Sequence, residues 1–470
     1  MSVTIPELPL LTLSDDEVQL LTALRSDLLE QRFKLELLDA YFNGEQVVRD
    51  LGISIPPQLK GLHTVIGWPR IGVESLERRL DLEAFRWADG SDSTELEVIA
   101  ESNDLFDEAS LAHLDALTYG REYVSVGSGE DGDPPLITFE SPLDMTLFWD
   151  ARLRLATAAL RESVEDGTRI ATLYLPDQTV YAAEVDGGWE VFDRDIHRLG
   201  IVPVLRMANR QRTADRIGRS EITPEVMSIT DAACRRLMGI EVAAEFFGAP
   251  QRYILGASES AFQDAEGNAK SAWETYIGRV LALERDENGD VPTVGAFTAH
   301  DPSGQTKIID LYARIMASQL SVAPHVLGYS ADNPASADAI RYADNAQVKK
   351  AERCIRRFSA THRDAMRLAL WFQNGEPPEK SRRIETVWRN PATPTIAAQT
   401  DAAVKLVQAG ILPADGDVVL EMAGLTEDQR RRVQAERLRA QGTALLDRLT
   451  QAAPTGPEPE TEVADGDEGL

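Results

Sequence analysis

The spacing of apolar positions predicts helices in the first part of the chain. From Val18 to Phe42 apolar residues recur every three or four positions, which indicates an amphipathic helix. Ser14 and the acids that follow it can cap its start, and Gly44 can end it. The same spacing predicts helices over 73–82 and 102–117. Leu105, Leu111, Leu114 and Leu117 are expected on one face of the latter.

Beyond residue 120 the pattern changes to short β-branched and aromatic runs, divided by clusters of Gly, Asp and Pro. The predicted strands are 122–126, 136–140, 168–174, 179–184, 189–192 and 202–206. We therefore expect residues 1–222 to form an α+β domain with a mostly antiparallel sheet.

A well-capped helix is predicted from residue 223, where Thr223, Pro224 and Glu225 provide the capping hydroxyl, the N1 proline and the first-turn acid. Apolar residues follow along one face until Gly248 and Pro250 end the helix. The members of this seam are Val226, Ile229, Ala233, Leu237 and Ile240, continued by Ala244 and Phe247. We expect such a seam where neighbouring subunits pack side by side.

A small strand module follows, with strands over 251–254, 280–284 and 293–297 and a turn over 286–290. A second helix is predicted over 303–322, up to Pro324. After a loop, Ser336 can cap a third helix that reaches Phe372, over three times the mean helix length. The remaining chain is predicted to be helical with short breaks, and its acidic end after Pro454 to be disordered.

The net charge of the chain limits the classes of function that it can have. The 470 residues include 77 acidic and 48 basic ones, which gives a formal net charge of −29. Binding nucleic acid through a general basic surface is excluded, because that mode needs Lys and Arg to displace phosphate counterions. Two interpretations stay open: a charge that serves solubility, or a surface that repels a polyanion.

Candidate catalytic chemistry is sparse. There is no HExxH and no paired CxxC, and Cys234 and Cys354 lie in apolar helical patterns that favour buried free thiols. No secretory signal and no run of ~18 apolar residues is present, so we expect a protein made in the cytoplasm without a membrane span. Neither a metal nor a cofactor is expected. His362 and Asp364 remain the candidates for a metal-dependent hydrolase.

Arginines 430–432, 437 and 439 form a basic cluster. Asp428 and Glu436 lie four residues on either side of Arg432, which favours a salt-bridged surface helix over contact with nucleic acid.

Several local motifs occur in a characteristic order. They are 41–44 (YFNG), 66–70 (IGWPR), 73–76 (VESL), 141–142 (SP), 246–252 (FFGAPQR), 323–328 (APHVLG) and 336–340 (SADAI). On these motifs, residues 10–450 resemble the portal proteins of tailed phages, in the SPP1-portal-like family found in actinobacteriophages. None of the motifs is a catalytic signature, and the resemblance implies a protein that is not an enzyme.

The resemblance implies a portal fold with an α/β wing, a helical stem hairpin, a small β-containing clip, a long kinked wing helix and a helical crown. The implied parts are the wing at 1–222, stem helices at 223–247 and 303–322, the clip at 248–302, the tunnel loop at 323–335, the wing's long helix and return strand at 336–390, the crown at 391–452 and an acidic tail at 453–470.

The resemblance also implies a ring of about twelve subunits at one capsid vertex of the virion, through which double-stranded DNA passes during packaging and ejection. The implied partners are the large terminase subunit, a head-completion or adaptor protein, and the major capsid and scaffolding proteins. Gly328, Tyr329, Ser330, Ala331, Asp332 and Asn333 would line the constriction, and Asp286, Glu287, Asn288 and Asp290 would face the motor. Another multimeric head–tail connector is the alternative within this class.

Overall fold

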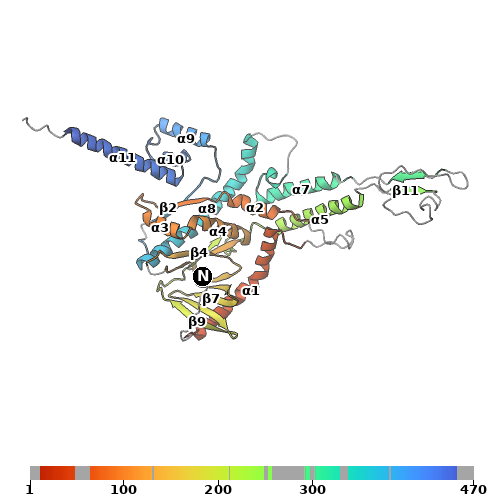
Figure 1. Cartoon of the computed structure of the whole chain (residues 1–470), viewed down its shortest axis with the longest axis horizontal. Helices are drawn as coiled ribbons and strands as arrows, with labels where there is room; N and C mark the ends of the chain where they lie inside the picture. Colours follow the sequence, from red (N-terminus) through yellow and green to blue (C-terminus); the bar gives the residue numbers. More distant parts are fainter. Residues whose placement is uncertain are drawn as a thin grey trace, which may run out of the picture.

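An α+β body carries helical extensions on two opposite sides (Figure 1). The computed structural model describes residues 11–47, 64–129, 132–210, 212–247, 252–256, 291, 293–296, 301, 303–328, 337–379 and 383–452. A hairpin of two helices extends from one side of the body, and a group of three helices lies on the other (Figure 1). The expected α+β class is confirmed.

The larger sheet is an antiparallel meander at the lower end of the body in Figure 1. Every neighbouring pair in it is antiparallel. In spatial order its strands are β1 (Leu11–Thr12), β9 (Gly188–Asp195), β8 (Thr179–Val185), β7 (Thr168–Tyr174), β6 (Leu155–Glu165) and β5 (Met145–Asp150).

Two smaller sheets lie against the helices of the main core. The three-stranded sheet runs β10 (Val204–Ala208), β3 (Arg121–Gly127) and β4 (Leu136–Glu140). Its central strand β3 is buried over six consecutive residues because α4 (Leu105–Tyr119) and α8 (Ala337–Asn374) both pack on this sheet. The other sheet pairs β2 (Leu82–Trp87) with β13 (Ile384–Trp388) across almost 300 residues of sequence.

Helix α1 (Asp15–Asn43) connects the larger sheet to the main core. Leu21 and Leu24, near its start, pack on the six-stranded sheet, whereas Leu35 and Leu38 belong to the main core. One amphipathic helix therefore serves two separate hydrophobic clusters.

A capping box and an ion pair stabilise the start of α1. Ser14 and Glu17 form a capping box, and Arg194 of β9 donates to both carboxylate oxygens of Glu17 at 2.6 and 2.9 Å. These bonds to Arg194 lower the pKa of Glu17 to about 2.

The remaining elements complete the body and its extensions. They are α2 (Trp68–Glu77), α3 (Thr94–Ser102), α5 (Pro224–Phe247), α7 (Ser303–Leu320), the 3-10 helix η3 (Pro324–Leu327), α9 (Ile396–Gln408), α10 (Asp417–Met422), α11 (Glu427–Ala452) and the strand pair β11 (Arg252–Leu255) and β12 (Thr293–Ala296).

Most predicted elements are present. The prediction missed β2, β5 and β6, and it joined the end of α3 to α4. In α4 the buried face is made largely of Ala109, Ala112 and Ala116, so Leu111 points outward with 60% exposure, contrary to prediction. Small residues that allow close packing carry little signal in a pattern read from large apolar side chains.

The expectation for the two cysteines is confirmed. Cys234 on α5 and Cys354 on α8 are both buried and free.

Candidate functional site at the base of the helical hairpin

Helices α5 and α7 form the hairpin, and β11 and β12 extend it (Figure 1). In this strand pair Arg252 lies opposite Ala296 and Leu255 opposite Thr293, an antiparallel register. Two of the three strands predicted in this module are therefore observed. The third, predicted at 280–284, lies outside the described residues.

The apolar seam of α5 packs inside the subunit. Val226 and Ala233 are 0% exposed in a single chain, and Ile229 packs against the same core. Leu237 and Ile240, further along, are half-buried. The expectation that this seam joins neighbouring subunits is therefore wrong for Val226 and Ala233, which the chain's own core already covers.

A buried carboxylate fixes the base of the hairpin. The side chain of Glu221, just before α5, is 1% exposed, and its Oε2 lies 2.5 Å from Lys350 Nζ of α8. Its Oε1 accepts a hydrogen bond of 2.9 Å from Asn209 Nδ2, and Arg210 lies 3.5 Å from Oε2. Such a charge is stable in the interior only when its partners remain in place, so this cluster ties α5, α8 and the segment after β10 together.

Helix α2 contacts the chain before residues 329–336. At the end of α7, Leu320 packs against Gly72 so closely that a Cβ at Gly72 would lie 2.5 Å from Leu320 Cδ2. Lys350 Nζ also donates to the carbonyl oxygen of Leu320 over 3.4 Å. Gly328 then ends η3 with φ of +82°, a left-handed conformation that glycine adopts without strain.

Helix α2 also contacts the chain after residues 329–336. Gln347 of α8 donates to Ser75 Oγ over 2.9 Å, and Arg79 Nε donates to Gln347 Oε1 over 3.2 Å. Gln347 is 2% exposed, so this contact is part of the interior. The chain between Leu320 and Gln347 thus leaves α2 and returns to it.

The residues predicted from sequence to act in this region are mostly outside the described part of the chain. Gly328 is described and marks the point where the loop departs. Tyr329, Ser330, Ala331, Asp332 and Asn333 lie outside it, as do Asp286, Glu287, Asn288 and Asp290.

The structure argues against a hydrolase that acts through His362. His362 is 1% exposed, and its Nε2 lies 2.8 Å from Nε2 of His113 on α4. Phe139 and Trp388 enclose it, and burial lowers the pKa of both histidines. A substrate cannot reach this ring, and Asp364 is exposed elsewhere on the helix. Within the described ranges no group of three or more His, Cys, Asp or Glu could hold a metal ion.

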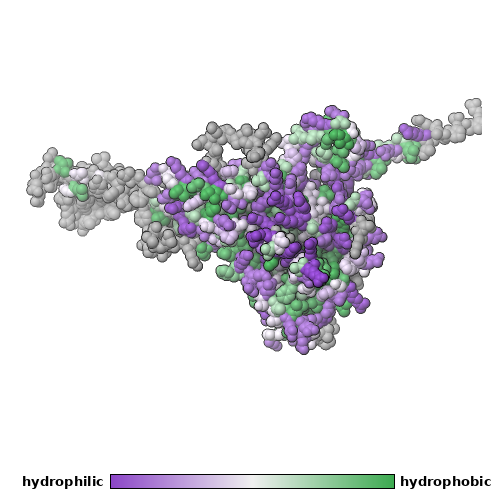
Figure 2. All heavy atoms as spheres, turned by 180° about the vertical axis from the view of Figure 1, so that it is seen from behind, coloured by the Kyte–Doolittle hydropathy of each residue, from purple (hydrophilic) through white to green (hydrophobic). Residues whose placement is uncertain are grey.

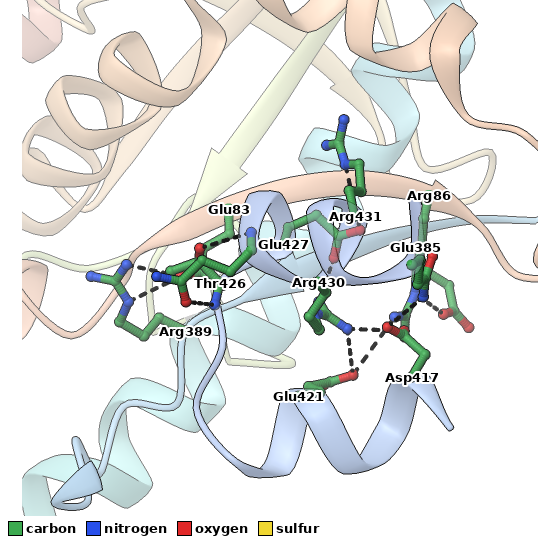
Figure 3. Close-up of polar contacts among 12 residues, drawn as sticks. Glu83, Arg86, Glu385, Arg389, Asp417, Glu421, Thr426, Glu427, Arg430 and Arg431 are labelled. Atoms are coloured by element: carbon green, nitrogen blue, oxygen red, sulfur yellow. Dashed lines mark hydrogen bonds and ion pairs between the residues drawn. The ribbon is translucent and has the colours of Figure 1, made fainter. Parts of the chain in front are cut away.

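A charged cluster organises the three C-terminal helices (Figure 3). Arg430 of α11, with a side chain 2% exposed, pairs with Asp417 at 3.0 Å, with Glu421 at 3.2 Å and with Glu427. The described ion pairs of this arginine-rich helix involve Arg430 and Arg431, and the expected pairing of Arg432 with Asp428 and Glu436 stays a prediction. The prediction that the cluster lies on the surface is wrong for Arg430, which joins α10 to α11 from the interior.

Ion pairs also attach these helices to the body. Arg431 lies 2.7 Å from Glu97 of α3. Arg86 of β2 lies 3.7 Å from Glu421 (Figure 3). Among the described residues of α9, α10 and α11, Ala403 and Val419 are the only buried hydrophobic ones. The C-terminal helices therefore depend more on charge than on an apolar core.

No described helix is both long and apolar enough to span a membrane. The described part combines an α+β body, a projecting helical hairpin and a buried ionic junction at the base of the hairpin.

Comparison with known proteins identifies the family. The family model described as phage portal protein, SPP1 Gp6-like, matches residues 23–443. The portal protein of Mycobacterium phage D29 is 35% identical over 442 residues, covering 91% of this chain and 90% of that protein. The portal protein of Mycobacterium phage L5 is 34% identical over 432 residues, covering 89% and 88%. The chain belongs to the SPP1 Gp6-like family of phage portal proteins.

Solved structures with a similar chain come from gene transfer agent particles. A chain in the virion of the native particle is 17% identical, with a TM-score of 0.44, and covers 76% of this chain and 89% of that one. A chain in the neck of the native particle, computed with C12 symmetry, is 16% identical, with a TM-score of 0.45, and covers 76% and 90%.

Proposed function

We propose that about twelve copies of this chain close into a ring at one vertex of a phage capsid, and that double-stranded DNA passes through it during packaging and ejection. Family membership supports this role, since the relatives named portal proteins match nine-tenths of the chain. Residues 1–222 would form the wing, α5 and α7 the stem, 248–302 the clip, 323–335 the tunnel loop, 336–390 the wing's long helix and return strand, and 391–452 the crown.

The observation that carries the proposal is the anchoring of the loop. Leu320 and Gln347 both contact α2, so the two ends of the segment between them are held at one place on each subunit. In a closed ring this point repeats by symmetry, and the loops would form a collar of fixed radius. Gly328 to Asn333 would then touch the DNA at the constriction.

The net charge fits a conduit. Twelve copies of a chain with charge −29 would carry roughly −350, which repels the phosphate backbone over the surface as a whole. A basic lining would instead bind DNA at each step and slow its passage. The acidic balance therefore favours translocation over retention.

An exposed apolar stripe on α7 provides a surface for the neighbouring subunit. Leu311 is 51% exposed and Ile315 is 39% exposed, while Ala313, Met316 and Ala317 on the other side of the helix are buried. Hydrophobic side chains gather over the α5–α7 hairpin in the space-filling view (Figure 2). Large exposed apolar residues at helical spacing on a stem helix would be covered by packing in a ring.

The remaining partners follow from the position of each part. The clip, including Asp286, Glu287, Asn288 and Asp290, would meet the large terminase subunit and later a head-completion or adaptor protein. The wing would face the major capsid and scaffolding proteins. The chain would be made in the host cytoplasm and end in the virion. ATP hydrolysis would belong to the terminase, so this chain's role requires no catalysis of its own.

Shortening the loop tests the proposal. Deletion of Ser330, Ala331 and Asp332 should leave ring assembly intact, because both anchors on α2 remain, and should reduce the amount of packaged or retained DNA in phage particles. A variant with these three residues replaced by Gly-Ser-Gly keeps the length and serves as the control. Rings seen by negative-stain imaging together with unchanged DNA yield in the deletion variant would refute the loop's role. If the native chain stays a monomer and forms no rings, the proposed ring assembly is refuted.

A further inference from the structure

Helix α1 carries a second apolar face on the side away from the core. Val18 is 46% exposed, Leu29 54%, Phe33 78% and Leu37 39%. With about 3.6 residues per turn, these four positions share one side of the helix. The opposite side holds the buried residues Leu21, Leu24, Leu28, Leu35 and Leu38. A helix that is apolar on two sides is expected to be covered on both.

The centre of this exposed face is uncharged. Thr22 and Ser26 lie between Val18 and Leu29, and the hydroxyl of Thr22 donates to the carbonyl oxygen of Val18 over 2.7 Å. This polar group is therefore satisfied within the helix and would not oppose burial. We call the face the α1 stripe and define it by Val18, Thr22, Ser26, Leu29, Phe33 and Leu37.

The charges beside the α1 stripe cancel. Arg32 and Glu36 border one edge, with Arg32 Nε 2.9 Å from Glu36 Oε1, and the exposed Glu30 and Lys34 lie beyond the other edge. Most of the surface of a chain with net charge −29 would repel a second copy of the same chain. Two copies can meet at this locally neutral surface without that repulsion.

The α1 stripe leads toward the base of the hairpin. Helix α1 runs from the larger sheet to α5, where Tyr41 donates to Asp231 over 2.9 Å (Figure 1). Helix α5 packs along α7, whose exposed Leu311 and Ile315 are proposed above to meet a neighbouring stem. The two exposed apolar surfaces therefore belong to one packed set of helices.

The size of the α1 stripe indicates which occupant fits it. Its length from Val18 to Leu37 is about 28 Å, and a helix face about 10 Å wide gives it an area of roughly 280 Å². One side of a standard protein interface buries about 800 Å². The stripe is thus too small to hold a separate partner protein by itself, and it fits as one part of a larger interface that also includes α7.

We propose that the α1 stripe packs against the wing of a neighbouring copy of this chain, with Phe33 at the centre of the contact. This inference rests on the ring proposed above and extends its subunit interface from the stem into the wing. In a ring the contact is head to tail, so the stripe of each copy meets a different surface of the next copy. A large aromatic side chain at the centre of an interface is the kind of residue that contributes most to binding.

Photo-crosslinking tests the contact directly. Benzoylphenylalanine in place of Phe33 in the full-length chain forms covalent bonds only to atoms that lie against it. We expect illuminated rings to yield covalent dimers and larger species, and rings mixed from heavy- and light-isotope copies should show by mass spectrometry that the links join different copies. The exposed Lys34 lies about 100° further round the helix and is the matched control position, which should give at least about tenfold fewer links.

The variant Phe33→Glu measures how much the contact contributes to assembly. The concentration at which rings dissociate should rise at least about tenfold, because a carboxylate would be buried against an apolar surface, and mass photometry over a dilution series measures this. Phe33→Leu should stay near the native value, and so should Lys34→Glu, a larger change in charge beside the stripe. Because Phe33 is 78% exposed and Glu has the higher helix propensity, the Phe33→Glu monomer should keep its unfolding midpoint.

Three results would overturn the inference. Intact rings in which position 33 links only within its own chain, or not at all, would refute this contact and leave the proposed ring standing. Links from position 33 to a capsid or scaffolding protein and not to a second copy, in particles from infected cells, would assign the α1 stripe to that partner instead. A native chain that forms no rings would refute the ring and this contact together.

Discussion

His113 and His362 face each other in the main core with their Nε2 atoms 2.8 Å apart. The pair joins α4 to α8 across 249 residues of sequence, and both side chains are almost wholly buried. His113 stacks on Phe358 and on Trp388, so neither ring can turn toward solvent. At this distance one nitrogen donates and the other accepts, so the accepting ring must be neutral.

The first prediction concerns pH. Burial lowers the pKa of both histidines, so the unfolded chain binds more protons than the folded one as pH falls below about 6.5. The free energy of unfolding should therefore decrease from pH 7.5 to pH 5. Urea titrations at the two pH values measure this. In the double variant His113→Leu/His362→Leu this part of the pH dependence should disappear.

Single substitutions separate the pair from the rest of the core. His362→Leu alone should cost about 1–3 kcal/mol, because His113 loses its partner in the interior. The double variant should cost less than the sum of the two single ones. His325→Leu, at an exposed position of η3, is the control. Additive costs would show that the two rings are not coupled.

A second prediction has the opposite pH dependence. Glu122 on β3 is 2% exposed, and burial, assisted by Asp115 and Glu140, raises its pKa well above the usual range. Below its unfolded pKa of about 4.5, the Glu122 carboxyl is protonated in both the folded and the unfolded chain, and its contribution to stability is complete. As pH rises above this value, the unfolded chain releases the proton more readily than the folded chain, so this contribution to the free energy of unfolding is lost. Glu122→Gln should therefore increase the free energy of unfolding at pH 8 by about 1–2 kcal/mol, and by less at pH 5. The exposed Glu101→Gln should change neither value, and a destabilised Glu122→Gln protein at pH 8 would contradict the assignment.

A third prediction concerns the attachment of the C-terminal helices. Arg430→Met removes the cation shared by Asp417, Glu421 and Glu427 and leaves three carboxylates close together (Figure 3). Hydrogen exchange in α10 and α11 should become at least about tenfold faster, while α4 and α8 keep their protection. The exposed Arg439→Met on the same helix should have no such effect. Equal exchange in both variants would mean that the ion cluster does not hold these helices.

A fourth prediction tests the stripe on α7. Leu311→Glu places a charge on the surface proposed to meet a neighbouring stem and should shift the protein from rings toward monomers, as measured by mass photometry. Because Leu311 is 51% exposed in the single chain, the monomer should keep its unfolding midpoint. Leu311→Met, which keeps the surface apolar, should still form rings. Normal rings from Leu311→Glu would place the subunit contact elsewhere.

The sequence by itself determined the local elements and the family. Period and capping residues predicted α1, α5, α7 and α8, since these signals depend on neighbours within a few positions. Motif order indicated the portal family, which the comparisons confirm. The strands β2, β5 and β6 were missed because a strand is stabilised by its pairing partner and by the helices that cover it, which a local sequence pattern does not show.

Only the tertiary structure decided which distant residues meet. The seam of α5 was predicted correctly as apolar, but its buried half packs against the chain's own core. A periodic apolar pattern shows that one face of a helix is covered and does not show which surface covers it. Likewise, no local signal relates His113 to His362, Gly72 to Leu320, or Trp149 to Arg206. These contacts depend on how helices and sheets pack together, a property of the folded chain as a whole.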